Sequence, residues 1–199
     1  MTESKTTKKF STINIVLLAL LTAIVAVMQM IGAFIRFGPF SISLVLMPIS
    51  IGAALIGSFA GCWLGLVFGF VVLLSGDAAL FLAINPFSAI FLVLLKGALA
   101  GLAAGAVYCL FCAKSRTLAA VSAGAVCPIV NTGVFIIGSY VFFLPTIAEW
   151  GRAAGYSSAT LFIFFGMIGL NFLFELGLNL VLSPVIVRLI QYGQDRGMA

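Results

Sequence analysis

Histidine is absent from this chain of 199 residues, and charged residues make up only 8% of it. Without histidine the chain cannot form a histidine-based catalytic triad, a histidine-ligated metal site or a histidine proton relay. It also lacks the Gly-x-x-x-x-Gly-Lys-Ser/Thr motif, so it cannot hydrolyse ATP by the P-loop route. Its five acidic residues leave little for chemistry that needs two carboxylates. We therefore expect no enzyme activity, no resident cofactor and no metal site.

Apolar residues make up 63% of the sequence, and its mean hydropathy is +1.30. A soluble domain carries about 25% charged residues, so this chain has too few to cover a water-facing surface. The apolar runs are long and do not alternate, whereas strands of a membrane barrel alternate over about ten residues. The composition predicts an all-α integral membrane protein.

Glycine, proline and polar residues divide the chain into six apolar runs, which predict six transmembrane helices. These runs are 13–35, 42–58, 61–74, 88–112, 118–144 and 161–189. The first run is too long for the apolar region of a signal peptide, so we interpret it as a retained span. The expected organisation is a basic leader (1–12), one transmembrane domain (13–189) and a short tail (190–199), with loops at 75–87 and 145–158.

Basic residues test this topology. With both termini cytoplasmic, the cytoplasmic side receives seven of them: Lys5, Lys8, Lys9, Lys114, Arg116, Arg188 and Arg196. Two, Arg36 and Arg152, fall in outer loops, and Lys96 lies within the fourth run. This bias follows the positive-inside rule and favours both termini in the cytoplasm. The net charge of +5 is then placed to meet anionic lipid headgroups, and we expect no binding of nucleic acid.

Small residues recur at helical spacing in three of the predicted spans. The glycines at four-residue intervals are Gly57, Gly61, Gly65 and Gly69, followed by Gly97, Gly101 and Gly105. Such stripes let helix backbones approach closely in lipid, and packing within the chain is the simplest interpretation. Ala19, Ala23 and Ala26 form a similar stripe in the first run, which could pack internally or dock another membrane subunit.

Cys109 and Cys112 have the spacing of a metal or redox pair, but the chain has no second such pair and no histidine. Together with Cys62 and Cys127, they fall in or beside apolar runs. We interpret all four cysteines as small apolar residues of the helices.

Polar side chains within the last three apolar runs form the candidate site. Asn171, Glu175 and Asn179 recur every four residues, which places them on one helix face. A carboxylate inside a bilayer costs at least about 2.5–3.5 kcal/mol, so it usually faces a cavity or a partner. At about 1.5 Å per residue, Lys96 and Asn131 reach similar depths in the outer half to middle of the membrane.

Two interpretations of this convergence stay open. Lys96 and Glu175 could form a buried ion pair while the asparagines bond across helices as structural polar contacts. Alternatively, these groups could orient a small polar ligand in a pocket that opens to the outside.

Several short segments, spread over 13–188, together resemble a known family. They are ALLTA at 19–23, SLVLMPISIGAALIGSFAG at 43–61, Asn85-Pro86, Lys96-Gly97-x-x-x-Gly101 and Asn131-Thr132-Gly133. With the chain length and the six spans, they resemble the substrate-binding S components of energy-coupling factor (ECF) vitamin transporters. The Asn-Pro and Asn-Thr pairs are most similar to the pantothenate-type branch.

The resemblance implies that the chain binds a water-soluble vitamin or precursor in a cavity near the outer face. It also implies that the first helix docks onto an energy-coupling transmembrane subunit driven by two ATPase subunits. Carried over by residue, the docking stripe is Ala19, Ala23 and Ala26, and the cavity candidates are Lys96, Asn131, Asn171, Glu175, Asn85 and Arg36. The carboxylate of pantothenate could pair with Lys96 or Arg36, but Glu175 opposes an anion, so a neutral or cationic vitamin stays open.

Two other functions are compatible with the residues. The chain could be a stand-alone secondary transporter in which Glu175 is the proton- or cation-coupling group, or a membrane scaffold without a ligand. In each case we expect a multi-pass protein of a cell membrane, and the resemblance suggests a bacterial plasma membrane.

Overall fold

The computed structural model describes residues 12–34, 36–37, 40–41, 44–182, 185, 187–188 and 192. The predicted all-α class is confirmed, because nearly all of these residues are helical. A two-residue antiparallel pair, β1 (Arg36–Phe37) and β2 (Phe40–Ser41), interrupts the helices after the first one. The predicted leader (1–12) and tail (190–199) lie almost entirely outside the described residues, so their boundaries stay predictions.

The main helices follow the predicted spans closely. They are α1 (Thr12–Gly32), α2 (Leu46–Leu55), α3 (Ser58–Leu74), α5 (Pro86–Cys112), α6 (Arg116–Phe142) and a last segment of α8 (Ala159–Leu161), the π-helix η1 (Phe162–Ile168) and α9 (Gly169–Val181). By length and composition, α1, α5 and α6 can each cross a membrane. The last segment is bent by 45°, and its two parts are long and apolar enough to cross a membrane only when they are counted together, as a broken span or a re-entrant loop. Helices α2 and α3 are shorter apolar helices. Six spans with cytoplasmic termini stay a prediction.

The two expected loops each contain a helix, which corrects the sequence interpretation. Helix α4 (Ala79–Ile84) lies within 75–87, and α7 (Leu144–Ala153) begins one residue before 145–158 and occupies its first part. Pro145 suggested a loop, yet proline is well tolerated in the first helical turn, where its missing N–H has no partner to lose. Ile147, on the inner face of α7, is fully buried, so packing stabilises the helix.

Glycine pairs bring α3 and α5 into backbone contact. A methyl group added at Gly65 would overlap the carbonyl of Gly97, and one added at Gly61 would overlap the carbonyl of Gly101. At the next crossing, a methyl group on Gly69 would lie 2.8 Å from the Val93 carbonyl oxygen. The predicted packing within the chain is therefore confirmed for Gly61, Gly65, Gly69, Gly97 and Gly101, and it fixes the spacing of two helices that line the candidate site. Gly57 does not take part: it lies in the turn before α3 at φ 126°, where an added methyl group would meet nothing within 4 Å.

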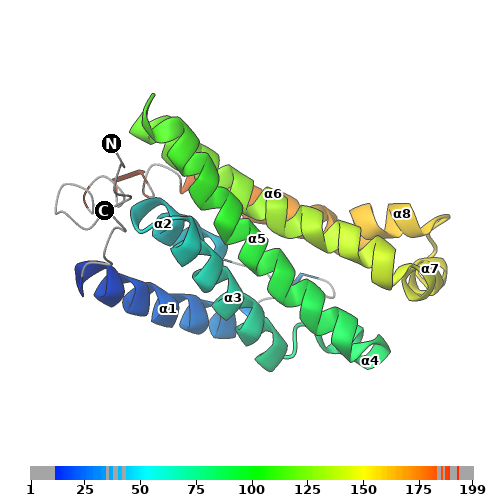
Figure 1. The fold of residues 1–199 in the computed structure, drawn as a ribbon. Helices are drawn as coiled ribbons and strands as arrows, with labels where there is room; N and C mark the ends of the chain where they lie inside the picture. The colour runs from blue at the N-terminus through cyan, green and yellow to red at the C-terminus, as the bar shows by residue number, and fades with distance from the viewer. Residues whose placement is uncertain are drawn as a thin grey trace, which may run out of the picture.

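Figure 1 shows the arrangement of the helices. Helices α4, α7 and α8 lie at one end of the bundle, at the right of the view, whereas the turn between α5 and α6 lies at the other end. Two groups of buried apolar side chains fill the interior: one lies among α1, α2, α3, α5 and α6, and the other lies among α4, α5, α6, α7 and η1. The polar cavity described below lies between helices that contribute to both groups.

Candidate ligand-binding cavity

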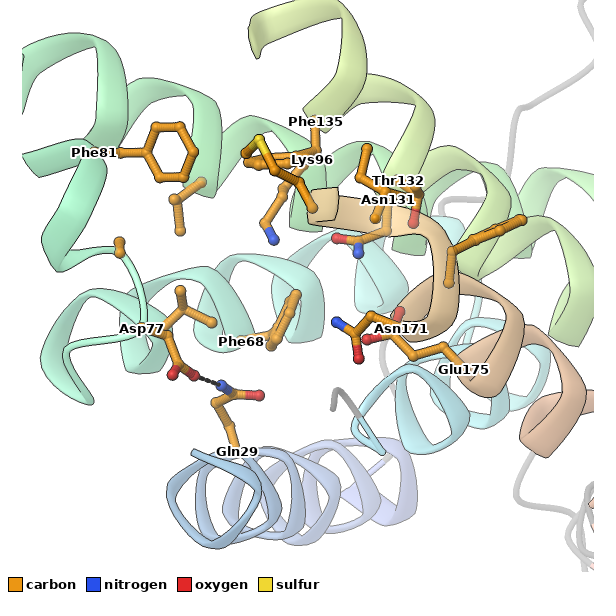
Figure 2. A pocket seen from close by; sticks show the side chains of 16 residues that line it. Gln29, Phe68, Asp77, Phe81, Lys96, Asn131, Thr132, Phe135, Asn171 and Glu175 are labelled. Atoms are coloured by element: carbon orange, nitrogen blue, oxygen red, sulfur yellow. Dashed lines mark hydrogen bonds between the residues drawn. The ribbon is translucent and has the colours of Figure 1, made fainter. Parts of the chain in front are cut away.

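A cavity opens between the helices of the bundle (Figure 2). Its accessible volume is about 90 Å³, which is smaller than the roughly 300–1,000 Å³ of typical small-molecule pockets. Residues of α1, α3, α4, α5, α6, η1 and α9, and of the turn that leads into α4, line it. Its polar lining residues are Gln29, Asp77, Lys96, Asn131, Thr132, Asn171 and Glu175.

Lys96 lies on α5 beside the glycine contact with α3, and its ammonium group points into the cavity (Figure 2). Its Nζ atom is 5.5 Å from the ring centroid of Phe68 and 5.5 Å from that of Phe135. Both rings are within the range in which an aromatic face attracts a cation. The carboxylates of Asp77 and Glu175 attract the same ammonium group. Lys96 thus sits between two rings and under the influence of two acidic side chains.

Gln29 and Asp77 form a polar wall that connects α1 to the end of α3. The Nε2 atom of Gln29, a fully buried residue, donates a hydrogen bond of 2.9 Å to Oδ2 of Asp77. Gly76, at φ 82°, makes the tight turn that places Asp77 next to the cavity, in a conformation that suits glycine. Because Nε2 must face the carboxylate, Oε1 of Gln29 is left as an acceptor. Within the described chain it has no hydrogen-bond partner.

The opposite wall comes from α6, η1 and α9. Asn131, on α6, is 5% exposed, and across the described residues its Oδ1 atom meets no donor. Glu175, on α9, is 4% exposed, and Asn171 lies one turn before it. Asn179 lies outside the cavity lining, and its Nδ2 atom donates a 2.9 Å hydrogen bond to the backbone oxygen of Glu175. Of the three residues predicted to share one polar face of the last span, Asn171 and Glu175 therefore line the cavity, whereas Asn179 is bonded to its own helix.

Aromatic rings pack at the end of the cavity formed by α4 and α7. Phe81, which lines the cavity, lies 5.5 Å from Phe135, 5.0 Å from Phe143 and 6.0 Å from Trp150, measured between ring centroids. All three contacts are edge-to-face, the arrangement that aromatic pairs favour. This cluster ties α4, α6 and α7 together beside the cavity.

The structure brings together four of the six cavity candidates, namely Lys96, Asn131, Asn171 and Glu175. Asn85 lies elsewhere: it caps α5, and its side chain accepts a 3.1 Å hydrogen bond from the backbone N–H of Ser88. Arg36 lies in β1, where the description covers its backbone only. The roles of these six residues in ligand binding stay predictions.

Sequence reasoning missed Gln29 and Asp77. Gln29 carries a detectable signal, because it is a polar residue within an otherwise apolar first span. Asp77 falls in a segment that the sequence predicts to be a loop, and only the turn at Gly76 brings it to the cavity.

On α1, Ala19 and Ala23 are exposed and Ala26 is half-buried, so the predicted docking stripe is accessible.

A polar cavity among apolar helices is typical of membrane proteins that bind a small solute. The chain belongs to the family described as "ECF transporter, substrate-specific component", whose model matches residues 14–187. The resemblance noted from the sequence is thereby confirmed at the level of the family, and the protein is a transporter subunit, not an enzyme.

The fold is similar to that of ThiT from Listeria monocytogenes, with a TM-score of 0.62 and 23% sequence identity. The similarity covers 90% of this chain and 96% of the ThiT chain. No curated protein sequence matches the chain significantly.

Proposed function

We propose that the chain captures a water-soluble vitamin or vitamin precursor in the cavity around Lys96 and delivers it across the cell membrane with an ATP-driven energy-coupling module. The observation that carries this proposal is the cavity itself. Lys96, Asn131 and Glu175 come from three separate helices, and all line one cavity. Polar groups that served only to join helices would not need to converge on a cavity.

The identity of the vitamin is a separate question. The sequence resemblance suggests pantothenate, and Lys96 is the group that would pair with its carboxylate. However, Asp77 adds a second carboxylate to a lining in which sequence reasoning had placed only Glu175. The charge balance of the lining therefore moves away from an anionic ligand.

We propose that α1 docks onto the energy-coupling subunit through Ala19 and Ala23. Their small side chains are exposed on the helix surface, where a partner helix could approach closely. Only Gln29 among the residues of α1 lines the cavity in the described structure. The docking face and the ligand site therefore use different residues, and a substitution can impair one without the other.

Co-expression with an energy-coupling subunit and its two ATPases tests both parts. The double variant Ala19→Trp/Ala23→Trp should abolish co-purification and ATP-dependent uptake in liposomes, while vitamin binding by the isolated chain stays unchanged. Ile24→Trp is the matched control, because Ile24 is 37% exposed and lies about 100° or more from both Ala19 and Ala23 around the helix. This control variant should preserve both co-purification and ATP-dependent uptake.

Uptake by the isolated chain without ATPases, abolished by a protonophore, would refute the ATP-driven role and favour a proton-coupled carrier. If no vitamin in a thermal-shift panel stabilised the purified chain, and no small molecule remained bound after purification, ligand capture itself would be refuted.

A further inference from the structure

We infer that the ligand of this cavity is a small organic cation with N–H or O–H donors, rather than a carboxylate. This inference rests on the proposed function and concerns the same site. Its first basis is charge: the described lining contains two carboxylates, Asp77 and Glu175, and one ammonium group, Lys96. The formal charge of the described lining is then −1, and one positive charge on a ligand would neutralise it.

Acidic and aromatic side chains already surround the ammonium group of Lys96. Asp77 and Glu175 both attract it, and the faces of Phe68 and Phe135 lie on either side of its Nζ atom. A ligand carboxylate placed beside Lys96 would compete with both acidic side chains for one ammonium group. It would also bring a third negative charge into a space enclosed by apolar helices, where water screens charges poorly.

Hydrogen-bonding capacity is the second basis, and it does not depend on charge. Oε1 of Gln29 and Oδ1 of Asn131 are buried acceptors that lack a donor within the described chain. Gln29 and Asn131 are 0% and 5% exposed, and both line the cavity from opposite sides (Figure 2). Buried acceptors are normally hydrogen-bonded in folded proteins. A ligand with N–H or O–H donors can satisfy them, whereas a carboxylate group placed beside them cannot.

The Gln29–Asp77 hydrogen bond specifies which end of the cavity receives the positive charge. By donating to Oδ2, Gln29 holds the carboxylate of Asp77 in a fixed orientation next to its own Oε1 acceptor. Together they present a charged acceptor and a neutral acceptor side by side, an arrangement suited to a protonated or otherwise cationic nitrogen group with a neighbouring donor.

The test measures dissociation constants by isothermal titration calorimetry on the full chain in detergent. The probes are thiamine as a cationic vitamin, pyridoxine as a neutral one and pantothenate as an anion. In parallel, small molecules retained through gentle purification are identified by mass spectrometry. We expect the retained molecule to be a cation and the cationic probe to bind at least tenfold more tightly than pantothenate.

The variant Asp77→Asn should weaken binding of the cationic probe or retained cation at least tenfold. Glu149→Gln is the matched control, because it removes one negative charge from an exposed position of α7 outside the cavity lining. It should leave the dissociation constant unchanged. An Asp77→Asn protein that still binds the cation as tightly as the wild type would overturn the inference.

Failure of the inference is distinguishable from failure of the proposed function. Tight binding of pantothenate, abolished by Lys96→Met, would overturn the cationic ligand but leave vitamin capture intact. Absence of any retained molecule and of any binding by the three probes would count against the capture function as well.

Discussion

The glycine contact between α3 and α5 allows a substitution whose effect follows from geometry. In Gly65→Ala, the new Cβ would overlap the carbonyl group of Gly97, so the two helix backbones must separate. The obstacle is backbone, which cannot rotate away as a side chain could. Overpacking of a close contact costs about 1–3 kcal/mol, and this contact lies at the upper end of the range.

Alanine also favours the helix over glycine by about 1 kcal/mol, which offsets part of the loss. We therefore expect Gly65→Ala to lower the free energy of unfolding by about 2 kcal/mol. The overlap costs about 3 kcal/mol, and the higher helix propensity of alanine offsets about 1 kcal/mol of it. For a chain of this size, about 2–4 °C of Tm correspond to 1 kcal/mol, so the Tm should fall by about 4–8 °C.

Gly133→Ala is the control, because Gly133 lies within α6 and an added methyl group would meet nothing within 4 Å. It gains the helix propensity without the overlap, so its Tm should stay the same or rise by about 2–4 °C. Thermal unfolding of the three proteins in one detergent, followed by intrinsic tryptophan fluorescence, measures these shifts.

A double-variant cycle sharpens the test. A methyl group on Gly97 would overlap the carbonyl of Gly65, so Gly65→Ala and Gly97→Ala demand the same separation of the helices. The double variant should therefore lose less stability than the sum of the two single losses. If Gly65→Ala unfolded at the same temperature as Gly133→Ala, or if the losses added fully, the proposed backbone contact would be refuted.

Two further predictions separate structural from ligand-binding roles. Asn85→Ala removes the side-chain cap of α5 and should lower stability by about 0.5–2 kcal/mol without changing ligand affinity, which thermal unfolding and calorimetry check in one sample. A large loss of affinity at unchanged stability would instead place Asn85 at the ligand. Asn171→Ala and Glu175→Gln should both weaken ligand binding while the bundle stays folded, as measured by calorimetry and circular dichroism. Equal losses of stability in both variants, without a specific loss of affinity, would indicate structural polar contacts.

Most of the fold could be predicted from the sequence because lipid imposes simple requirements on a chain. A helix that spans the membrane must satisfy its backbone groups internally and present apolar side chains, so the runs of apolar residues mark the helices directly. The glycine stripes likewise predicted close helix contacts, since small residues are what permits them. Helix α7 escaped prediction, because Pro145 and the charged residues Glu149 and Arg152 are typical of a loop as well as of an amphipathic helix.

The site was predictable to the extent that it used residues unusual in a membrane. Lys96 and Glu175 are conspicuous because ionisable groups in apolar runs are rare, and the rise per residue put them at comparable depths. Gln29 and Asp77 depend on how α1 packs against the end of α3, and no local pattern reports such a contact between distant segments. Asn179 shows the same limit in reverse: its spacing matched the site, yet its side chain bonds to the backbone of its own helix.

The π-helix η1, directly before α9, has a consequence for how tolerant this region is to changes in length. A π-helical turn accommodates one residue more than an α-helical turn over the same stretch of axis. Loss of a single residue from Phe162–Ile168 would therefore let the segment revert to regular α-helix without rotating the residues after it. Asn171 and Glu175 would keep their orientation toward the cavity. A deletion within the regular α-helix of α9, before Glu175, would instead rotate the residues after it by about 100°. Loss of one residue from the π-helix should therefore impair ligand recognition far less than loss of one residue from α9.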